Sequence, residues 1–201
     1  MNSVVAAAGL LVAAQLHAQT VRYTGTAPGN GSLVKIEGTS TIHDWTVEGK
    51  MVGGSMEIDP GFDADLKTLK ITPKVLVKIP VQQLHDIAKQ KGMDEVFYQA
   101  MKATDYANIE YRLNDLKAKE GGKFEATGSL TVAGVTKTNT MSVIFERVDS
   151  SKIKVSGSTS MKMSDFNIKP PVLGVAGVSI KTGDEIKLSL GWVVKKTEAP
   201  K

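Results

Sequence analysis

The sequence contains no cysteine, which excludes several kinds of chemistry at once. Without thiols there is no disulfide, no thiolate nucleophile, no cysteine-ligated zinc and no cysteine to carry a lipid anchor. Histidine is nearly as scarce, with 3 residues among 201, and aromatic residues make up only 5% of the chain. The two tryptophans, Trp45 and Trp192, are therefore candidate residues of the hydrophobic core or of a ligand site.

Motifs for metal binding and catalysis are also lacking. His43 and His85 lie on different predicted elements, without the paired spacing of a metal site. The sequence has no Gly-x-Ser-x-Gly turn to present a nucleophilic serine. Asp94 and Glu95 are neighbours on a predicted helix, where adjacent side chains diverge, which favours a solvated charged face. We therefore predict no catalytic residue, no metal and no cofactor.

The chain has little excess charge and no clustered charge. Its 25 Lys and Arg residues exceed its 21 Asp and Glu residues by a formal net charge of +4. The lysines are spread along the predicted strands, whereas nucleic-acid binding usually shows a basic stripe with aromatic residues interleaved. We expect no nucleic-acid partner. The sequence leaves open whether the protein forms a homodimer.

Long hydrophobic runs are absent except at the N-terminus. The uncharged run from Val4 to Ala14 is too short to span a bilayer, and a small residue, Ala18, ends the segment. This pattern is typical of a signal peptide, residues 1–18, although no Lys or Arg precedes the run. A buried core helix is the alternative. We expect a periplasmic or secreted protein with no stable membrane insertion.

Most of the remaining sequence alternates between apolar and polar residues with a period of two, which predicts half-buried strands. The clearest run has Ile186, Leu188, Leu190 and Trp192 on one side and mostly polar or small residues on the other. Alternation of this kind favours antiparallel pairing, because parallel strands tend to be apolar on both faces. Further strands are predicted at 34–37, 45–51, 55–59, 69–79, 109–113, 124–132, 141–145 and 153–163.

One segment, residues 81–103, follows a helical pattern instead. Met93, Val96, Phe97, Ala100 and Met101 have the spacing of an apolar helix stripe. The sequence thus predicts an all-β protein: a single antiparallel β-barrel of about eight strands with a short helical insertion near residues 81–103. A β-sandwich is the competing architecture. We divide the chain into the signal peptide, an N-terminal segment at 19–29, a barrel domain at 30–195 and a disordered tail at 196–201.

Three blocks of sequence resemble a known family. They are "STIHDWTVEGKMVGGSMEID" at 40–59, "VLVKIPVQQLHDIAKQKGMDEVFYQAMKATDYANIEYRL" at 75–113, and "GKFEATGSLTVAGVTKTNTMSVIF" at 122–145, which is followed by "SMKMSDFNIKPP" at 160–171. Together they resemble the YceI-like family of exported proteins, in its "HDW" branch. The resemblance implies a lipocalin-like barrel with a long internal cavity that binds isoprenoid lipids or related amphiphiles, and no catalysis.

Two positions depart from the family pattern. Ala107 follows Asp105-Tyr106 where the family usually has a proline, and Asn167 stands in Asp165-Phe166-Asn167 where the family usually has glycine. Asparagine tolerates the left-handed backbone that glycine would supply, so we expect the turn to survive. Asp165 is expected to bind local backbone N–H groups in that turn.

A lipid cavity needs apolar walls and a few polar groups, and the inward side of the predicted strands supplies the walls. The predicted ligand-binding residues are His43, Trp45, Val47, Val75, Val77, Met93, Phe97, Met101, Val132, Val143, Phe145, Leu188 and Leu190. The same side chains would also fill a solid core, which would make this a structural or interaction protein. A third possibility is a hydrolase or isomerase that uses His43 inside the barrel.

The adjacent pair His43-Asp44 cannot form a catalytic dyad in an extended strand, because neighbouring side chains point to opposite faces. His43 would share a face with Trp45 and Val47. We therefore predict that His43 is a polar group at one end of the cavity, with Asp44 outside it or holding the preceding turn.

Overall fold

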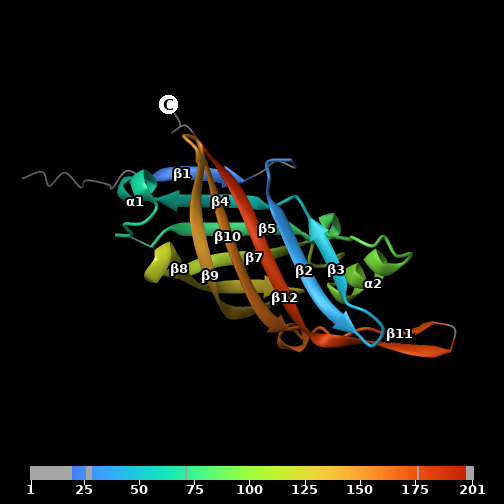
Figure 1. The fold of residues 1–201 in the computed structure, drawn as a ribbon. Helices are drawn as coiled ribbons and strands as arrows, with labels where there is room; N and C mark the ends of the chain where they lie inside the picture. Colours follow the sequence, from blue (N-terminus) through green and yellow to red (C-terminus); the bar gives the residue numbers. More distant parts are fainter. Residues whose placement is uncertain (1–19, 26–28, 71, 176, 198–201) are drawn as a thin grey trace, which may run out of the picture.

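The computed structural model describes residues 20–25, 29–70, 72–175 and 177–197 (Figure 1). The predicted signal peptide therefore lies outside the described residues, as do the last four residues of the predicted tail. Among the described residues the strands are β1 (Val21–Gly25), β2 (Leu33–Ser40), β3 (Trp45–Gly49), β4 (Gly53–Ile58), β5 (Lys74–Pro80), β6 (His85–Asp86), β7 (Asn108–Ala118), β8 (Lys123–Val132), β9 (Val135–Asp149), β10 (Lys152–Lys162), β11 (Val172–Val175) and β12 (Val178–Lys196).

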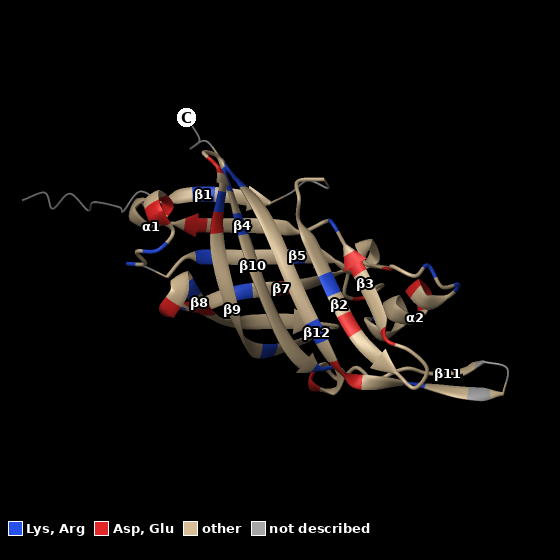
Figure 2. Cartoon of the chain, viewed as in Figure 1, with Lys and Arg blue, Asp and Glu red and all other residues tan. Residues whose placement is uncertain are grey.

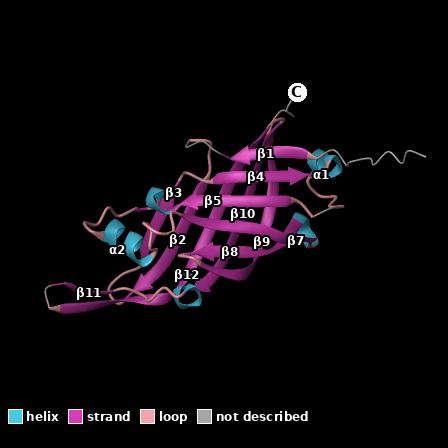
Figure 3. Ribbon diagram, turned by 180° about the vertical axis from the view of Figure 1, so that it is seen from behind, coloured by secondary structure: helices cyan, strands magenta, loops and turns pink. Residues whose placement is uncertain are grey.

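Two short helices and three 3-10 turns connect these strands. They are α1 (Pro60–Asp65), α2 (Met93–Ala100), η1 (Val81–Gln83), η2 (Glu120–Gly122) and η3 (Met163–Phe166). The two α-helices lie at opposite ends of the strand assembly (Figure 3). No helix in the described ranges is both long enough and apolar enough to cross a membrane.

The described strands form one antiparallel sheet that closes on itself. Eight of them follow the order β1-β4-β5-β7-β8-β9-β10-β12, and β12 pairs with β1 to complete the barrel. The predicted fold class, an all-β antiparallel barrel of eight strands with a short helical insertion, is confirmed. The remaining strands add to this barrel: β2, β3 and β6 continue outward from β12, and β11 forms a hairpin with its beginning.

β12 has two different neighbours along one edge. It pairs with β2 between Thr182 and Gly191, and with β1 at Lys195 and Lys196. The backbone groups of Val193, between these two ladders, are bound by side chains instead. The Val193 N–H donates to Ser32 Oγ at 2.9 Å, and its carbonyl accepts from Asn30 Nδ2 at 3.0 Å. The change of neighbour therefore leaves no buried backbone group of Val193 unpaired.

The N-terminal boundary of the barrel differs from the predicted residue 30, because β1 lies in the segment 19–29. This strand of five residues contributes Tyr23, which is fully buried. It is too short to show a clear period of two in the sequence. The Asp59-Pro60-Gly61 stretch, at the end of the predicted strand 55–59, begins α1. Asp59 accepts a hydrogen bond from the Phe62 N–H at 3.0 Å, and proline is well suited to the first helical position.

α1 closes one end of the barrel with an aromatic cluster. Phe62 is fully buried, and its ring packs edge-to-face on Phe124 and Phe145, with centroid distances of 5.6 and 5.2 Å. Phe124 and Phe145 contact each other in the same geometry at 5.4 Å. The three rings come from α1, β8 and β9, so this helix seals the space between the strands rather than covering their outer face.

Asp63 ties the same helix to the seam at which the barrel closes. It accepts hydrogen bonds from Tyr23 on β1 at 2.6 Å, from Arg147 on β9 at 2.9 Å and from Lys196 on β12 at 3.0 Å. Burial alone would raise the pKa of this carboxyl, but the donors from Tyr23, Lys196 and Arg147 outweigh it and hold the pKa below its ordinary value.

The outer face of the barrel carries both signs of charge on the same strands, so acidic and basic segments are interspersed (Figure 2). Some of these charges pair across neighbouring strands. Lys78 on β5 lies 2.8 Å from Glu110 on β7, and Arg22 on β1 lies 3.5 Å from Glu57 on β4. Such exposed pairs contribute little stability, about 0–1 kcal/mol each, and mainly keep the outer face polar.

We predict that Asp63→Asn destabilises the barrel by about 1–3 kcal/mol at pH 7, because three donors lose a charged acceptor. A carboxyl whose folded pKa is depressed stabilises the native state above its unfolded pKa, near 4, and loses that contribution as pH falls through the lower folded value. Urea unfolding of both proteins between pH 7 and pH 2 should therefore show a difference that shrinks below pH 4. The exposed Asp105→Asn is the control; a difference that is constant with pH would contradict this role.

Candidate functional site

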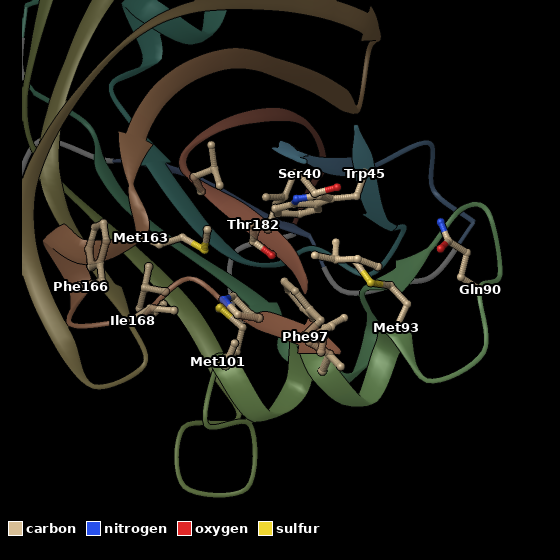
Figure 4. Close-up of a pocket in the computed structure, with 18 of the residues that line it drawn as sticks. Ser40, Trp45, Gln90, Met93, Phe97, Met101, Met163, Phe166, Ile168 and Thr182 are labelled. Carbon is tan, nitrogen blue, oxygen red and sulfur yellow. The ribbon is translucent and has the colours of Figure 1, made fainter. Parts of the chain in front are cut away.

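A cavity of about 410 Å³ lies inside the barrel at the end away from α1, and we call it the outer cavity. The residues around it come from β2, the β2–β3 turn, β3, α2 with its preceding loop, the ends of β7, β8 and β10, η3 with the loop after it, β11, and the first half of β12 (Figure 4). Most of its lining is apolar. The volume falls within the range of about 300–1,000 Å³ that is typical of small-molecule sites.

α2 forms one wall of the outer cavity with a single face. Met93, Val96, Phe97 and Ala100 all line it, as the helical spacing in the sequence predicts. These four side chains are only partly buried, because one side of each faces the open space of the cavity. Met101, directly after the helix, adds a second flexible thioether. Methionine side chains adapt to ligands of different shape, so this wall suits a variable apolar chain.

α2 is held in place by a small set of polar contacts with β6. The Asp94 carboxylate accepts from the Asp86 N–H at 2.7 Å and lies 2.9 Å from His85 Nδ1. Tyr98 donates its hydroxyl to the Leu84 carbonyl at 2.9 Å. Burial would raise the Asp94 pKa, but the donors from Asp86 and His85 lower it overall. Asp94, expected on a solvated charged face, thus orients the helix that forms the cavity wall.

The polar residues that line the outer cavity are Ser40, His43, Gln90, Lys91, Lys162 and Thr182. The first and last of these are partly buried, and the other four are exposed. His43 is exposed and lies in the turn before β3 begins, rather than in the strand itself. Its Nδ1 donates to the Asp44 carbonyl at 2.8 Å, which leaves Nε2 as the acceptor of the neutral ring. The turn is held by Ser40, whose hydroxyl donates to the His43 carbonyl at 2.7 Å.

Trp45 forms the wall next to this turn. Its indole N–H donates to the Thr39 carbonyl at 3.1 Å, and its ring lies across Gly38, its partner on β2. A side chain at Gly38 would overlap ring atoms Cζ2 and Cε2 of Trp45. Glycine at this position therefore allows the ring to lie flat against β2 and to line the cavity.

A second cavity of about 60 Å³ lies deeper in the barrel, and we call it the inner cavity. Its lining residues are Met56, Val75, Val77, Ile79, Ile109, Tyr111, Leu113, Leu116, Ala126, Leu130, Met141, Val143, Phe145, Val155, Leu188, Leu190 and Trp192. Ile109, Leu130 and Leu188 line both cavities, so these three side chains stand between them. The inner cavity reaches Phe145, one of the rings that α1 packs against.

The structure distributes the predicted ligand-binding residues over these two spaces. His43, Trp45, Met93, Phe97, Met101, Val132 and Leu188 line the outer cavity. Val75, Val77, Val143, Phe145, Leu188 and Leu190 line the inner one. Val47 is fully buried in the surrounding core and, among the described lining residues, belongs to neither.

Several lining residues were not among the predicted ones. Met161 and Met163 have the inward parity of their predicted strand, so alternation could have identified them. Phe166 and Ile168 could not be found in that way, because η3 and the turn after it place them. Asn167 adopts a left-handed conformation there, with φ of 55°, and Asp165 accepts from the Lys162 N–H at 3.2 Å, as predicted for this turn.

The chemistry of the lining bears on the enzymatic alternative. Among the described residues that line either cavity there is no aspartate or glutamate, so His43 has no acid partner within the site. Within the described ranges, no group of three His, Asp or Glu residues is placed to hold a metal ion. The arrangement offers mainly apolar contact, and the Ser40 hydroxyl next to His43 bonds the His43 backbone rather than its ring.

Gly38→Ala should displace the Trp45 ring, because the added methyl group and the ring cannot occupy the same space. We expect a loss of about 1–3 kcal/mol in unfolding free energy and a change in tryptophan emission. Chemical denaturation followed by fluorescence measures both. Gly174→Ala on β11 is the matched control, because nothing lies within 4 Å of the added methyl group there. Equal behaviour of the two variants would contradict the packing role of Gly38.

The comparisons with known proteins agree with this fold. The family model for the YceI-like domain matches residues 17–193. The chain matches no curated protein sequence. Among solved structures, BcnA of Burkholderia cenocepacia has a TM-score of 0.63 at 18% identity, over 81% of this chain and 95% of that one.

Two further structures are similar. A polyisoprenoid binding domain from Saccharophagus degradans has a TM-score of 0.63 at 10% identity, over 89% of this chain and 100% of that one. The YceI protein of Campylobacter jejuni has a TM-score of 0.57 at 20% identity, over 76% of this chain and 85% of that one. At such identities these structures show a shared fold. Because the family model covers most of the sequence, the chain belongs to the YceI-like family.

Proposed function

We propose that the protein is a periplasmic or secreted binding protein that holds an isoprenoid-like or other amphiphilic lipid inside its barrel. The observation that carries the proposal is the outer cavity, a largely apolar space of about 410 Å³ with few polar lining residues, most of which are exposed. An amphiphilic lipid has a matching composition, with a long apolar chain and few polar groups. The inner cavity extends the apolar space toward α1.

The energetics of such a site need no strong polar contact. Burial of apolar surface contributes about 25 cal/mol per Å², or about 0.8 kcal/mol per methylene group. A chain of several isoprene units therefore gains enough from contact with side chains such as Trp45, Phe97 and Leu188 to bind stably. The methionines of the lining adapt to the bends of such a chain.

Two other observations support the proposal. A solved structure with the same fold is described as a polyisoprenoid binding domain. The apolar run from Val4 to Ala14, within the predicted signal peptide, fits export, which would place the protein where isoprenoid lipids need a carrier through water. The cavity also speaks against a filled core, because a solid barrel would leave no space of this size.

The direct test is to identify what the protein carries. We expect organic extraction of the protein purified from its host, followed by mass spectrometry, to release an isoprenoid or another long-chain amphiphile in a near-stoichiometric amount. Delipidated protein should then bind a polyprenyl alcohol in a fluorescence titration. Protein that is repeatedly recovered empty and takes up no lipid would argue decisively against this function.

Phe97→Asp should weaken lipid binding by about tenfold or more, because it places an unpaired charge on the wall of the outer cavity. α2 lies at the edge of the barrel and Phe97 is only partly buried, so the fold should survive. Titration with a polyprenyl alcohol measures the loss. Gln99→Asp adds the same charge on an exposed position of the same helix and should bind normally. Comparable losses in both variants would mean that charge near the helix, not the cavity wall, is responsible.

A further inference from the structure

The inner cavity is apolar except for two side chains. Among its described lining residues, only Tyr111 and Trp192 carry a side-chain oxygen or nitrogen atom. Both atoms, the Tyr111 hydroxyl and Trp192 Nε1, are buried without a hydrogen-bond partner. Buried polar groups in proteins nearly always have a hydrogen-bond partner, so each unpaired atom needs an explanation. Trp192 Nε1 lies against Gly25 on β1, which does not line this cavity. The Tyr111 hydroxyl is therefore the unpaired group that a ligand in the inner cavity can satisfy.

The position of Tyr111 is set by its strand and by a glycine opposite. It lies on β7 with Ile109 and Leu113 on the same face, and all three line the inner cavity. Its ring lies against Gly128 on β8, where a Cβ would come within 2.5 Å of ring carbon Cζ and 2.6 Å of the hydroxyl oxygen. The sequence thus makes room for a phenol inside the barrel, where phenylalanine or leucine would serve a purely apolar core equally well.

The phenol is a neutral donor at any physiological pH, because burial raises the pKa of Tyr111 to about 12. A neutral tyrosine hydroxyl can donate one hydrogen bond as well as accept one. A ligand oxygen in the inner cavity can therefore accept a hydrogen bond from it. No Lys, Arg or His is found among the described residues that line the inner cavity, so a buried carboxylate or phosphate would lack a counter-charge. A neutral oxygen fits both conditions.

We propose that the inner cavity is a subsite for an uncharged hydrogen-bond acceptor of the ligand, a carbonyl or ether oxygen, that accepts from the Tyr111 hydroxyl. The proposal rests on the lipid-binding function and adds the chemistry of one end of the ligand. The subsite selects lipids that carry a neutral oxygen over pure hydrocarbons.

The ligand reaches this subsite from the outer cavity. Ile109, Leu130 and Leu188 line both spaces, so only side chains separate them. Beyond the inner cavity, the Phe62–Phe124–Phe145 cluster closes the barrel. A lipid thus enters with its neutral oxygen first, and its apolar chain then occupies the outer cavity between Trp45 and α2.

The test compares two matched probes, an isoprenoid methyl ketone and the hydrocarbon in which a methylene group replaces the carbonyl oxygen. We expect delipidated wild-type protein to bind both and to prefer the ketone by about five- to tenfold, the effect of one buried hydrogen bond. Tyr111→Phe should lose this preference while binding the hydrocarbon normally. Tyr106→Phe removes the same atom from an exposed ring that is absent from both cavity linings, and it should behave as wild type.

A spectroscopic measurement reports the contact itself. With a ¹³C-labelled carbonyl, the infrared stretch of the bound ketone should shift to lower frequency in the wild type and return toward its value in alkane solvent in Tyr111→Phe. Equal affinity of the wild type for both probes, or a carbonyl stretch that does not shift, would overturn the subsite. The Tyr111 hydroxyl would then pair with a bound water molecule instead. Failure of the wild type to bind the hydrocarbon and the ketone would overturn the lipid-binding function together with it.

Discussion

The change of neighbour along one edge of β12 governs the shape of the whole molecule. Where β12 pairs with β1, the wall closes into a barrel of eight strands whose end is filled by α1. Where it pairs with β2, the wall continues into β3 and β6, and the outer cavity lies beside that wider part. The change is possible because Ser32 and Asn30 bind the backbone of Val193 at the junction. The polar segment that contains Asn30 and Ser32 therefore allows β12 to border both the end of the barrel that α1 fills and the end that holds the outer cavity.

The sequence predicted the strands that are long enough to show which face is buried. β8, β9, β10 and β12 repeat their apolar residues over many positions, and α2 shows its helical stripe in the same way. β6 has two residues and β1 has five, so neither contains enough repeats to reveal a period. α1 was missed for another reason. A proline after an aspartate suits both a turn and the first turn of a helix, and only the burial of Phe62 against Phe124 and Phe145 decides between them.

Alternation also limits what could be predicted about the site. It places side chains inside the barrel but does not say whether they meet across it, since that depends on the summed volumes of residues from many strands. Val47 and Val75 have equivalent patterns, yet only Val75 borders a cavity. The orphaned hydroxyl of Tyr111 is a clearer case. The sequence places an aromatic residue on the inner face, but the absence of a partner becomes visible only when every neighbour is placed.

The aromatic seal at α1 has a consequence for traffic through the barrel. Phe62, Phe124 and Phe145 close one end, whereas the outer cavity lies at the other. A tube with one opening fills and empties by the same route, so a second lipid cannot push the first one out from behind. Under the proposed lipid-binding function, the lipid therefore leaves by the route past α2. A membrane or an acceptor protein that receives it must do so at that end of the barrel.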